Sequence, residues 1–154
     1  MRLSKASTYG LFAILYIAKH DADELVQGRA IADACGIPVE YLLKILQQLA
    51  RARVILSERG RRGGFQLRKS ATEITVLEIV EALEGAITGE LPVPDAIAEA
   101  NSMKRAIEEL CRESSEFARS LLGATSIEQL INSEPSPPVE TAHRTHTPGK
   151  AVKS

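Results

Sequence analysis

The side chains with the clearest chemistry are arginines in a short glycine-rich segment. Residues 59–64 read Arg-Gly-Arg-Arg-Gly-Gly, so Arg59, Arg61 and Arg62 lie among three glycines. Strand-like runs at 54–58 and 65–69 flank them, which predicts a β-hairpin with a basic tip. Such a tip suits the minor groove of DNA, whose negative potential attracts arginine. The other reading, a loop that cradles nucleotide phosphates, needs a strand leading directly into a helix.

A helix predicted from Pro38 to Arg51 carries a second set of polar groups. At 100° per residue one side holds Glu40, Lys44, Gln47 and Arg51, and the other holds Val39, Leu42, Ile45, Leu46, Leu49 and Arg53. Lysine and arginine bind phosphate or guanine, glutamine pairs with adenine, and glutamate accepts from cytosine. A solvated face is the plainer alternative. The basic hairpin that follows favours the DNA groove.

Two earlier helices must position these groups. A short helix from Gly28 to Cys35, broken by Gly36, completes a helix-turn-helix with Ile37 as a core plug. A first helix from Ser4 to His20 has an apolar face, expected at Leu11, Phe12, Leu15, Tyr16 and Ala18. The polar residues at its start are Arg2, Ser4, Lys5, Thr8 and Tyr9. They either bind DNA phosphates or form a solvated helix start with Ser4 as its cap.

Charge is divided unevenly along the chain. Residues 1–69 hold twelve Lys/Arg and six Asp/Glu, a net charge of +6, whereas residues 70–132 hold four and twelve, a net charge of −8. The basic part suits a polyanion, and the acidic part is left for protein contacts. No set of Ser, His and Asp suggests catalysis, because His20 ends a helix and His143 and His146 lie in the tail. We therefore expect a binding protein and not an enzyme.

The second half predicts a dimer. Thr75 and Glu78 have capping-box spacing before a core helix that ends at Gly85, and Asp95 can cap a long helix ending near Gly123. Along that helix an apolar seam recurs at steps of four and three: Met103, Ile107, Leu110, Ser114, Phe117 and Leu121. A short helix capped by Thr125 or Ser126 follows. We expect a DNA-binding domain at 1–85, a dimerisation segment at 86–132 and a disordered tail at 133–154.

The segments MRLSKASTYG, GIPVEYLLKILQQLARARVI, RGRRGGFQL and EITVLEIVEALEG together resemble the Rrf2 family of transcriptional regulators, over about residues 1–132. The resemblance implies a mainly α winged helix-turn-helix fold, a long dimerisation helix and a homodimer that binds double-stranded DNA. It also implies that Arg59 enters the minor groove, while Glu40, Lys44 and Gln47 face bases in the major groove. A repressor in the bacterial cytoplasm is expected. The alternative is a winged-helix adaptor that binds protein.

The chain departs from that family at its cysteines. Many members hold an iron-sulfur cluster through three closely spaced cysteines before the dimer helix, but residues 86–110 contain none here. Cys35 and Cys111 are expected to be small buried side chains, with a redox link through Cys111 as the alternative. No cofactor and no metal site are predicted. No run of residues is long and apolar enough to predict a membrane span. No motif in the sequence indicates an effector.

Overall fold

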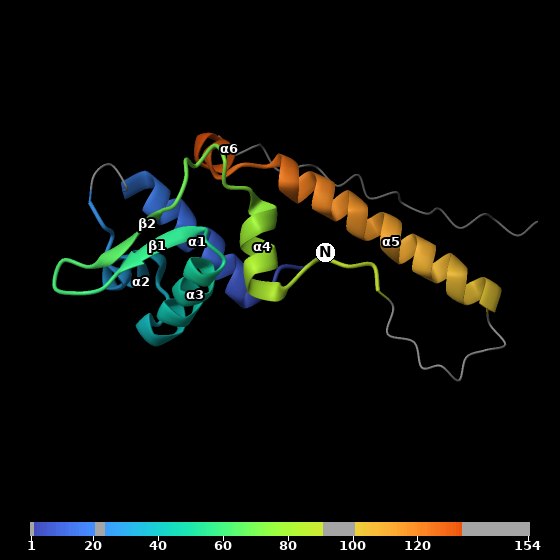
Figure 1. Ribbon diagram of the computed structural model, residues 1–154, viewed down its shortest axis with the longest axis horizontal. Coiled ribbons are helices and arrows are strands. Elements are labelled where there is room, and N and C mark those ends of the chain that lie inside the picture. Colours follow the sequence, from blue (N-terminus) through green and yellow to red (C-terminus); the bar gives the residue numbers. More distant parts are fainter. Residues whose placement is uncertain (1, 21–23, 91–100, 134–154) are drawn as a thin grey trace, which may run out of the picture.

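A computed structural model describes residues 2–20, 24–90 and 101–133. It shows a helical body from which one long helix projects (Figure 1). The fold is mainly α with a small β-hairpin, as the sequence predicts. The elements are α1 (Lys5–His20), α2 (Gly28–Cys35), α3 (Val39–Arg51), β1 (Ile55–Glu58), β2 (Gly64–Leu67), α4 (Val76–Glu84), α5 (Asn101–Ala124) and α6 (Ile127–Asn132).

Helix α1 is the centre of the core, and α2, α3, α4, α6 and β2 all pack on it. Its buried apolar face is Gly10, Ala13, Ile14 and Ile17, at helical spacing. The predicted face was wrong at Phe12, which is 56% exposed. The rest of the predicted face is partly buried against the core, at Leu11, Leu15, Tyr16 and Ala18. Residues 10–18 are apolar on almost every side, so periodicity alone could not select the direction that faces the core.

The helix-turn-helix forms where it was predicted. Gly36 ends α2 in the left-handed conformation, with φ of 63°, which glycine adopts without steric cost. Ile37 then turns into the core and donates its N–H to the carbonyl of Ala32 at 3.0 Å. The carbonyl of Pro38 accepts the N–H of Leu42 at 3.0 Å, so Pro38 lies at the N-cap of α3 and not in its first turn.

The inner side of α3 is confirmed as core except at its end. Leu42, Ile45, Leu46 and Leu49 are buried. The placement of Arg53 on that side was wrong, since Arg53 lies beyond the helix with φ of 62° and is exposed. The N–H of Val54 reaches back to the carbonyl of Leu49 at 3.0 Å, which is the Schellman ending of a helix.

Strands β1 and β2 pair antiparallel, with Ile55 opposite Leu67 and Glu58 opposite Gly64. Strand β1 begins one residue later than predicted, and β2 begins one residue earlier and ends two residues earlier than predicted. Val26, which precedes α2, exchanges two backbone hydrogen bonds of 2.8 Å with Phe65. The hairpin is therefore fastened to the start of α2 as well as to α3.

Helices α4 and α6 begin side by side. Each starts with a capping box, made by Thr75 with Glu78 in α4 and by Ser126 with Gln129 in α6. Thr75 and Ser126 also form an isolated antiparallel bridge. As expected, α4 packs on α1, and α6 folds back onto it with Ile127 buried.

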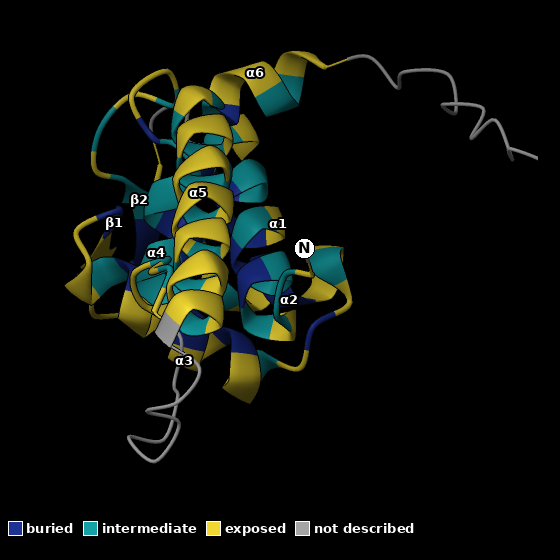
Figure 2. Ribbon diagram, turned by 90° about the vertical axis from the view of Figure 1, so that its right-hand side faces the viewer, coloured by how far each residue is buried: buried dark blue, intermediate teal, exposed yellow. Residues whose placement is uncertain are grey.

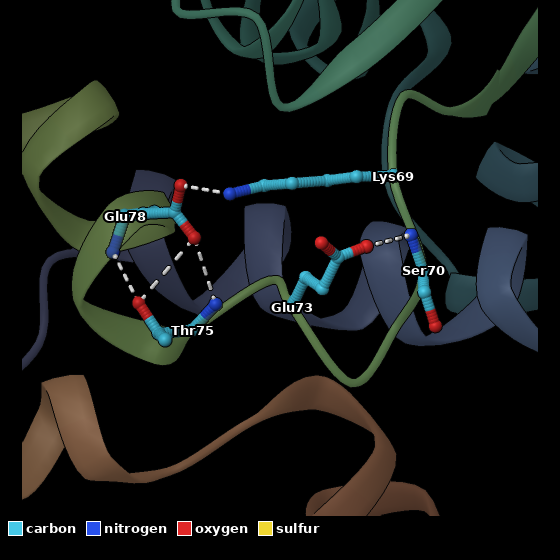
Figure 3. Close-up of polar contacts among 5 residues, drawn as sticks. All are labelled: Lys69, Ser70, Glu73, Thr75 and Glu78. Atoms are coloured by element: carbon cyan, nitrogen blue, oxygen red, sulfur yellow. Dashed lines mark hydrogen bonds and ion pairs between the residues drawn. The ribbon is translucent and has the colours of Figure 1, made fainter.

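Glu78 joins this cap to the hairpin (Figure 3). Its carboxylate accepts the N–H of Thr75 at 2.9 Å and pairs with the ammonium group of Lys69 at 2.6 Å. Burial raises the pKa of Glu78, but the hydrogen bonds from Lys69 and Thr75 outweigh burial and hold this pKa below its ordinary value.

We expect Glu78→Gln to lower the free energy of unfolding by less than about 1 kcal/mol at neutral pH, because glutamine keeps the cap and the ion pair is partly exposed. A carboxylate with a lowered folded-state pKa stabilises the fold above its unfolded pKa and loses that effect as the pH falls through the folded value. The difference from wild type should shrink below about pH 4.3. Urea unfolding between pH 7 and pH 3 tests this, and a constant difference would contradict it.

Helix α5 packs on α4, where the guanidinium of Arg119 pairs with the carboxylate of Glu81. The same carboxylate accepts the N–H of Ile87 at 3.1 Å, which ties the chain after α4 to this contact. None of the described helices is long and apolar enough to cross a membrane. The predicted cap at Asp95, the histidines of the tail and residues 134–154 lie outside the described part of the chain.

Candidate nucleic-acid interface

Helix α3 presents the polar face that the sequence predicts. Glu40, Lys44, Gln47 and Arg51 are all exposed, while the opposite side of the helix is buried in the core. The core therefore fixes the direction in which these four side chains leave the protein. Their chemistry, two cations with one amide and one carboxylate, matches base edges and phosphates.

A groove separates α3 from the hairpin. Gln47 and Arg51 line it from α3, and Ser57, Glu58 and Arg59 line it from the hairpin. Its remaining lining comes from Leu43, Ala50 and Phe65. The structure thus brings two of the four predicted helix residues together with the predicted wing arginine. A groove with a cation on either wall can hold a polyanionic strand.

The other wing arginines lie in a different place. Arg61 and Arg62 line a second hollow together with Glu24, Leu25 and Gln27, just before α2. Both arginines are exposed. The hairpin therefore offers cations on two sides, with Arg59 toward α3 and the other two toward the start of α2. From the sequence alone we interpreted the three arginines as one cluster.

The start of α1 adjoins the start of α3. The ammonium group of Lys5 lies 5.5 Å from the centre of the Tyr9 ring, and Tyr9 meets Tyr41 of α3 edge to face at 5.8 Å. Arg2 and Lys5 are exposed. The predicted residues of α1 consequently extend the surface of α3 at the end opposite the hairpin.

Ser4 has a structural role within this surface. Its hydroxyl accepts the N–H of Ser7 at 3.1 Å, which makes it the cap of α1, one of the two roles that the sequence left open. Its own N–H is donated to Glu84 at 3.0 Å. A contact between Ser4 and phosphate stays a prediction.

Sequence reasoning missed several residues at this surface, among them Tyr41, Ser57 and Glu84. Tyr41 and Glu84 contact the start of α1 from 32 and 80 residues away in sequence. Ser57 lies in the groove because of the strand pairing. No local pattern marks such contacts, since they arise only when separate elements pack.

The two cysteines lie on separate helices. Cys35 is half-buried in α2, and burial raises the pKa of its thiol, which makes it less reactive. Cys111 is half-buried in α5, where the backbone of Gly89 passes so closely that a Cβ added there would lie 2.9 Å from the carbonyl carbon of Cys111.

Comparisons with known proteins identify the family of the chain. The family profile Rrf2, described as an iron-dependent transcriptional regulator, matches residues 3–133. The HTH-type transcriptional regulator BadM of Rhodopseudomonas palustris is 34% identical over 131 residues, covering 85% of this chain and 81% of that protein.

Solved structures share the fold. CymR, the global cysteine regulator of B. subtilis, is 24% identical with a TM-score of 0.67, covering 85% of this chain and 96% of that one. IscR of T. potens is 24% identical with a TM-score of 0.58, covering 85% and 86%. Together with the exposed face of α3 and the arginine hairpin, the profile match over residues 3–133 shows that the chain belongs to the Rrf2 family of DNA-binding transcriptional regulators.

Proposed function

We propose that the chain is a homodimeric, sequence-specific repressor that places α3 in the major groove and Arg59 in the minor groove. The observation that carries this proposal is the groove in which Gln47 and Arg51 face Arg59. The sugar-phosphate strand separates the major from the minor groove, so a protein that reads both must straddle it. Repression needs only occupancy of the operator, which this surface can provide.

The chemistry of each side chain at this surface indicates whether it contacts bases or phosphates. Glu40, Lys44 and Gln47 supply base contacts, because a carboxylate, an ammonium group and an amide distinguish base edges. The phosphate contacts that set the register come from Arg2 and Lys5 beside the start of α3, and from Arg61 and Arg62 on the side of the hairpin toward α2. Arg51 lies in the groove between them and can contact either.

The dimer is proposed from α5. Nine large apolar residues are exposed in the described part of the chain, and five of them form one stripe on α5: Met103, Ile107, Leu110, Phe117 and Leu121. The outer side of α5 is exposed along its length (Figure 2). The stripe lies about a third of a turn from the side that packs on α4. A stripe of this kind on an exposed helix is the usual sign of a helix-helix interface.

We also propose that this member works without an iron-sulfur cluster. Such clusters are held by cysteine thiolates, and the chain has two cysteines, Cys35 on α2 and Cys111 on α5. Within residues 2–20, 24–90 and 101–133, no group of three His, Cys, Asp or Glu side chains is placed to hold a metal ion. The cysteines present therefore do not fit the three-cysteine cluster that the family resemblance implies. A redox link through Cys111 stays a hypothesis.

The test has two steps. First, purified protein selects its sites from fragmented genomic DNA, which should yield a two-fold symmetric motif. Second, affinity for one selected duplex is measured by fluorescence anisotropy between 50 and 200 mM salt. Affinity should fall by roughly 10³- to 10⁵-fold, as expected for six to ten phosphate contacts.

Two outcomes would contradict the proposal. Absence of binding at 50 mM salt would favour the adaptor that contacts protein instead of DNA. Binding to random and selected duplexes with equal affinity would show that α3 makes no sequence-specific contacts.

A further inference from the structure

Helix α1 begins without a carboxylate of its own. Its first turn contains no acidic residue, although the free N–H groups and the positive end of the helix dipole favour a negative charge there. The missing charge comes from α4. Glu84, the last residue of α4, accepts the N–H of Ser4 at 3.0 Å and also the hydroxyl of Ser7.

Ser7 shows that this contact is built into the core. It is fully buried, and it is the sole polar side chain in the buried set of the described residues. A buried hydroxyl without a partner costs free energy, and Glu84 provides that partner. Hydrogen bonds from Ser7 first, and then from Ser4, hold the pKa of Glu84 below its ordinary value, so the carboxylate is charged at neutral pH.

The anchored residue lies between two cations of the proposed interface. Ser4 is flanked by Arg2 and Lys5, which are both exposed. Lys5 lies over Tyr9, and Tyr9 meets Tyr41 at the start of α3. Fixing the backbone of Ser4 therefore fixes where both cations stand relative to α3.

We propose that Glu84 is a positioning residue for DNA binding: it holds residues 2–5 against α4, so that Arg2 and Lys5 meet the phosphate backbone. This inference rests on the proposed function. It predicts a change in DNA affinity opposite to the one expected from the charge of Glu84 alone. A carboxylate near DNA repels phosphate, so if Glu84 acted only through its charge, removing it would strengthen binding. A positioning role requires that removing it weakens binding.

The test compares wild type with Glu84→Ala and Ser7→Ala on a selected duplex. At 100 mM salt we expect Glu84→Ala to bind about tenfold more weakly, and Ser7→Ala to fall between it and wild type. The plot of log affinity against log salt should become shallower by about 1 unit, because a tenfold loss at 100 mM salt corresponds to about one lost phosphate contact. A purely structural defect would lower affinity without changing this slope.

A double-mutant cycle separates the two roles further. In an Arg2→Ala, Lys5→Ala background, Glu84→Ala should no longer weaken binding, because the groups it positions are gone. Glu73→Ala is the matched control: it removes an exposed carboxylate whose hydrogen bond, 3.2 Å to the N–H of Ser70, stays within its own turn. It should leave both affinity and slope unchanged.

Folding is checked by circular dichroism and thermal unfolding. If Glu84→Ala does not fold, Glu84→Asp replaces it, because aspartate keeps the charge but shortens the side chain by one methylene. Weaker binding by that variant together with a shallower salt slope supports positioning, whereas weaker binding with an unchanged slope overturns it. Unchanged or stronger binding by a folded variant, with an unchanged salt slope, overturns the positioning role alone. Failure of wild type to bind DNA at 50 mM salt overturns the proposed function and this inference together.

Discussion

Arg59→Ala is expected to weaken binding to a selected duplex by roughly 1–3 kcal/mol, about 5- to 150-fold. Arg59 lines the groove between α3 and the hairpin opposite Arg51, and it is exposed. Alanine removes a guanidinium that, in the proposed complex, is inserted in a narrow minor groove where the negative potential is strongest. The loss should be largest on duplexes with A·T-rich sequence at the wing contact.

The measurement is fluorescence anisotropy at fixed salt, with Arg68→Ala as the control. Arg68 is an exposed arginine just after β2, and it lines a separate hollow with Lys19 and Lys69. Both variants remove one positive charge, so a difference between them reports position and not net charge. Equal losses for the two variants would refute the role of Arg59 in the minor groove.

Phe117→Glu is expected to convert the dimer to a monomer, raising the dimer dissociation constant at least about 100-fold. Phe117 is 73% exposed, the largest exposed fraction in the α5 stripe. Burying a phenylalanine stabilises an interface by about 1.5–3 kcal/mol, and a two-fold dimer loses two of them. The protomer should keep its helical content, because Phe117 is not part of the hydrophobic core of the protomer.

Analytical ultracentrifugation over a range of protein concentrations measures this change. Ser120→Glu is the control, since Ser120 is exposed on α5 about a quarter of a turn from the stripe. A variant that remains as dimeric as wild type would show that another surface makes the dimer. Phe12, exposed on α1, would then be the next residue to test.

The features that could be predicted from sequence depend on short-range patterns. The buried side of α3 follows from apolar spacing, and the capping box at Thr75 and Glu78 follows from two residue types three apart. The face of α1 could not be found in this way, because residues 10–18 are apolar almost all round. Only the packing of five other elements decides which side of α1 is inside.

Some features of the functional site could likewise be predicted from local sequence patterns, and others depend on how separate elements pack. Glu40, Lys44, Gln47 and Arg51 were identified because a helix wheel separates them from the core. That Arg59 faces α3 while Arg61 and Arg62 face the start of α2 depends on how the hairpin is fastened to Val26. The contact of Glu84 with Ser7 joins residues 77 apart and has no local signature.

The backbone hydrogen bonds that join the start of α4 to the start of α6 have a mechanical consequence for a dimer. Val76 donates to the carbonyl of Thr125, and Ile127 donates to the carbonyl of Ile74, each at 2.9 Å. These two hydrogen bonds hold one end of α5, which at 1.5 Å per residue is about 36 Å long. A rotation of about 5° at the joint moves the far end by about 3 Å, close to one base-pair step of about 3.4 Å. The rigidity of a few backbone hydrogen bonds far from the DNA would then decide how much variation in operator spacing the dimer tolerates.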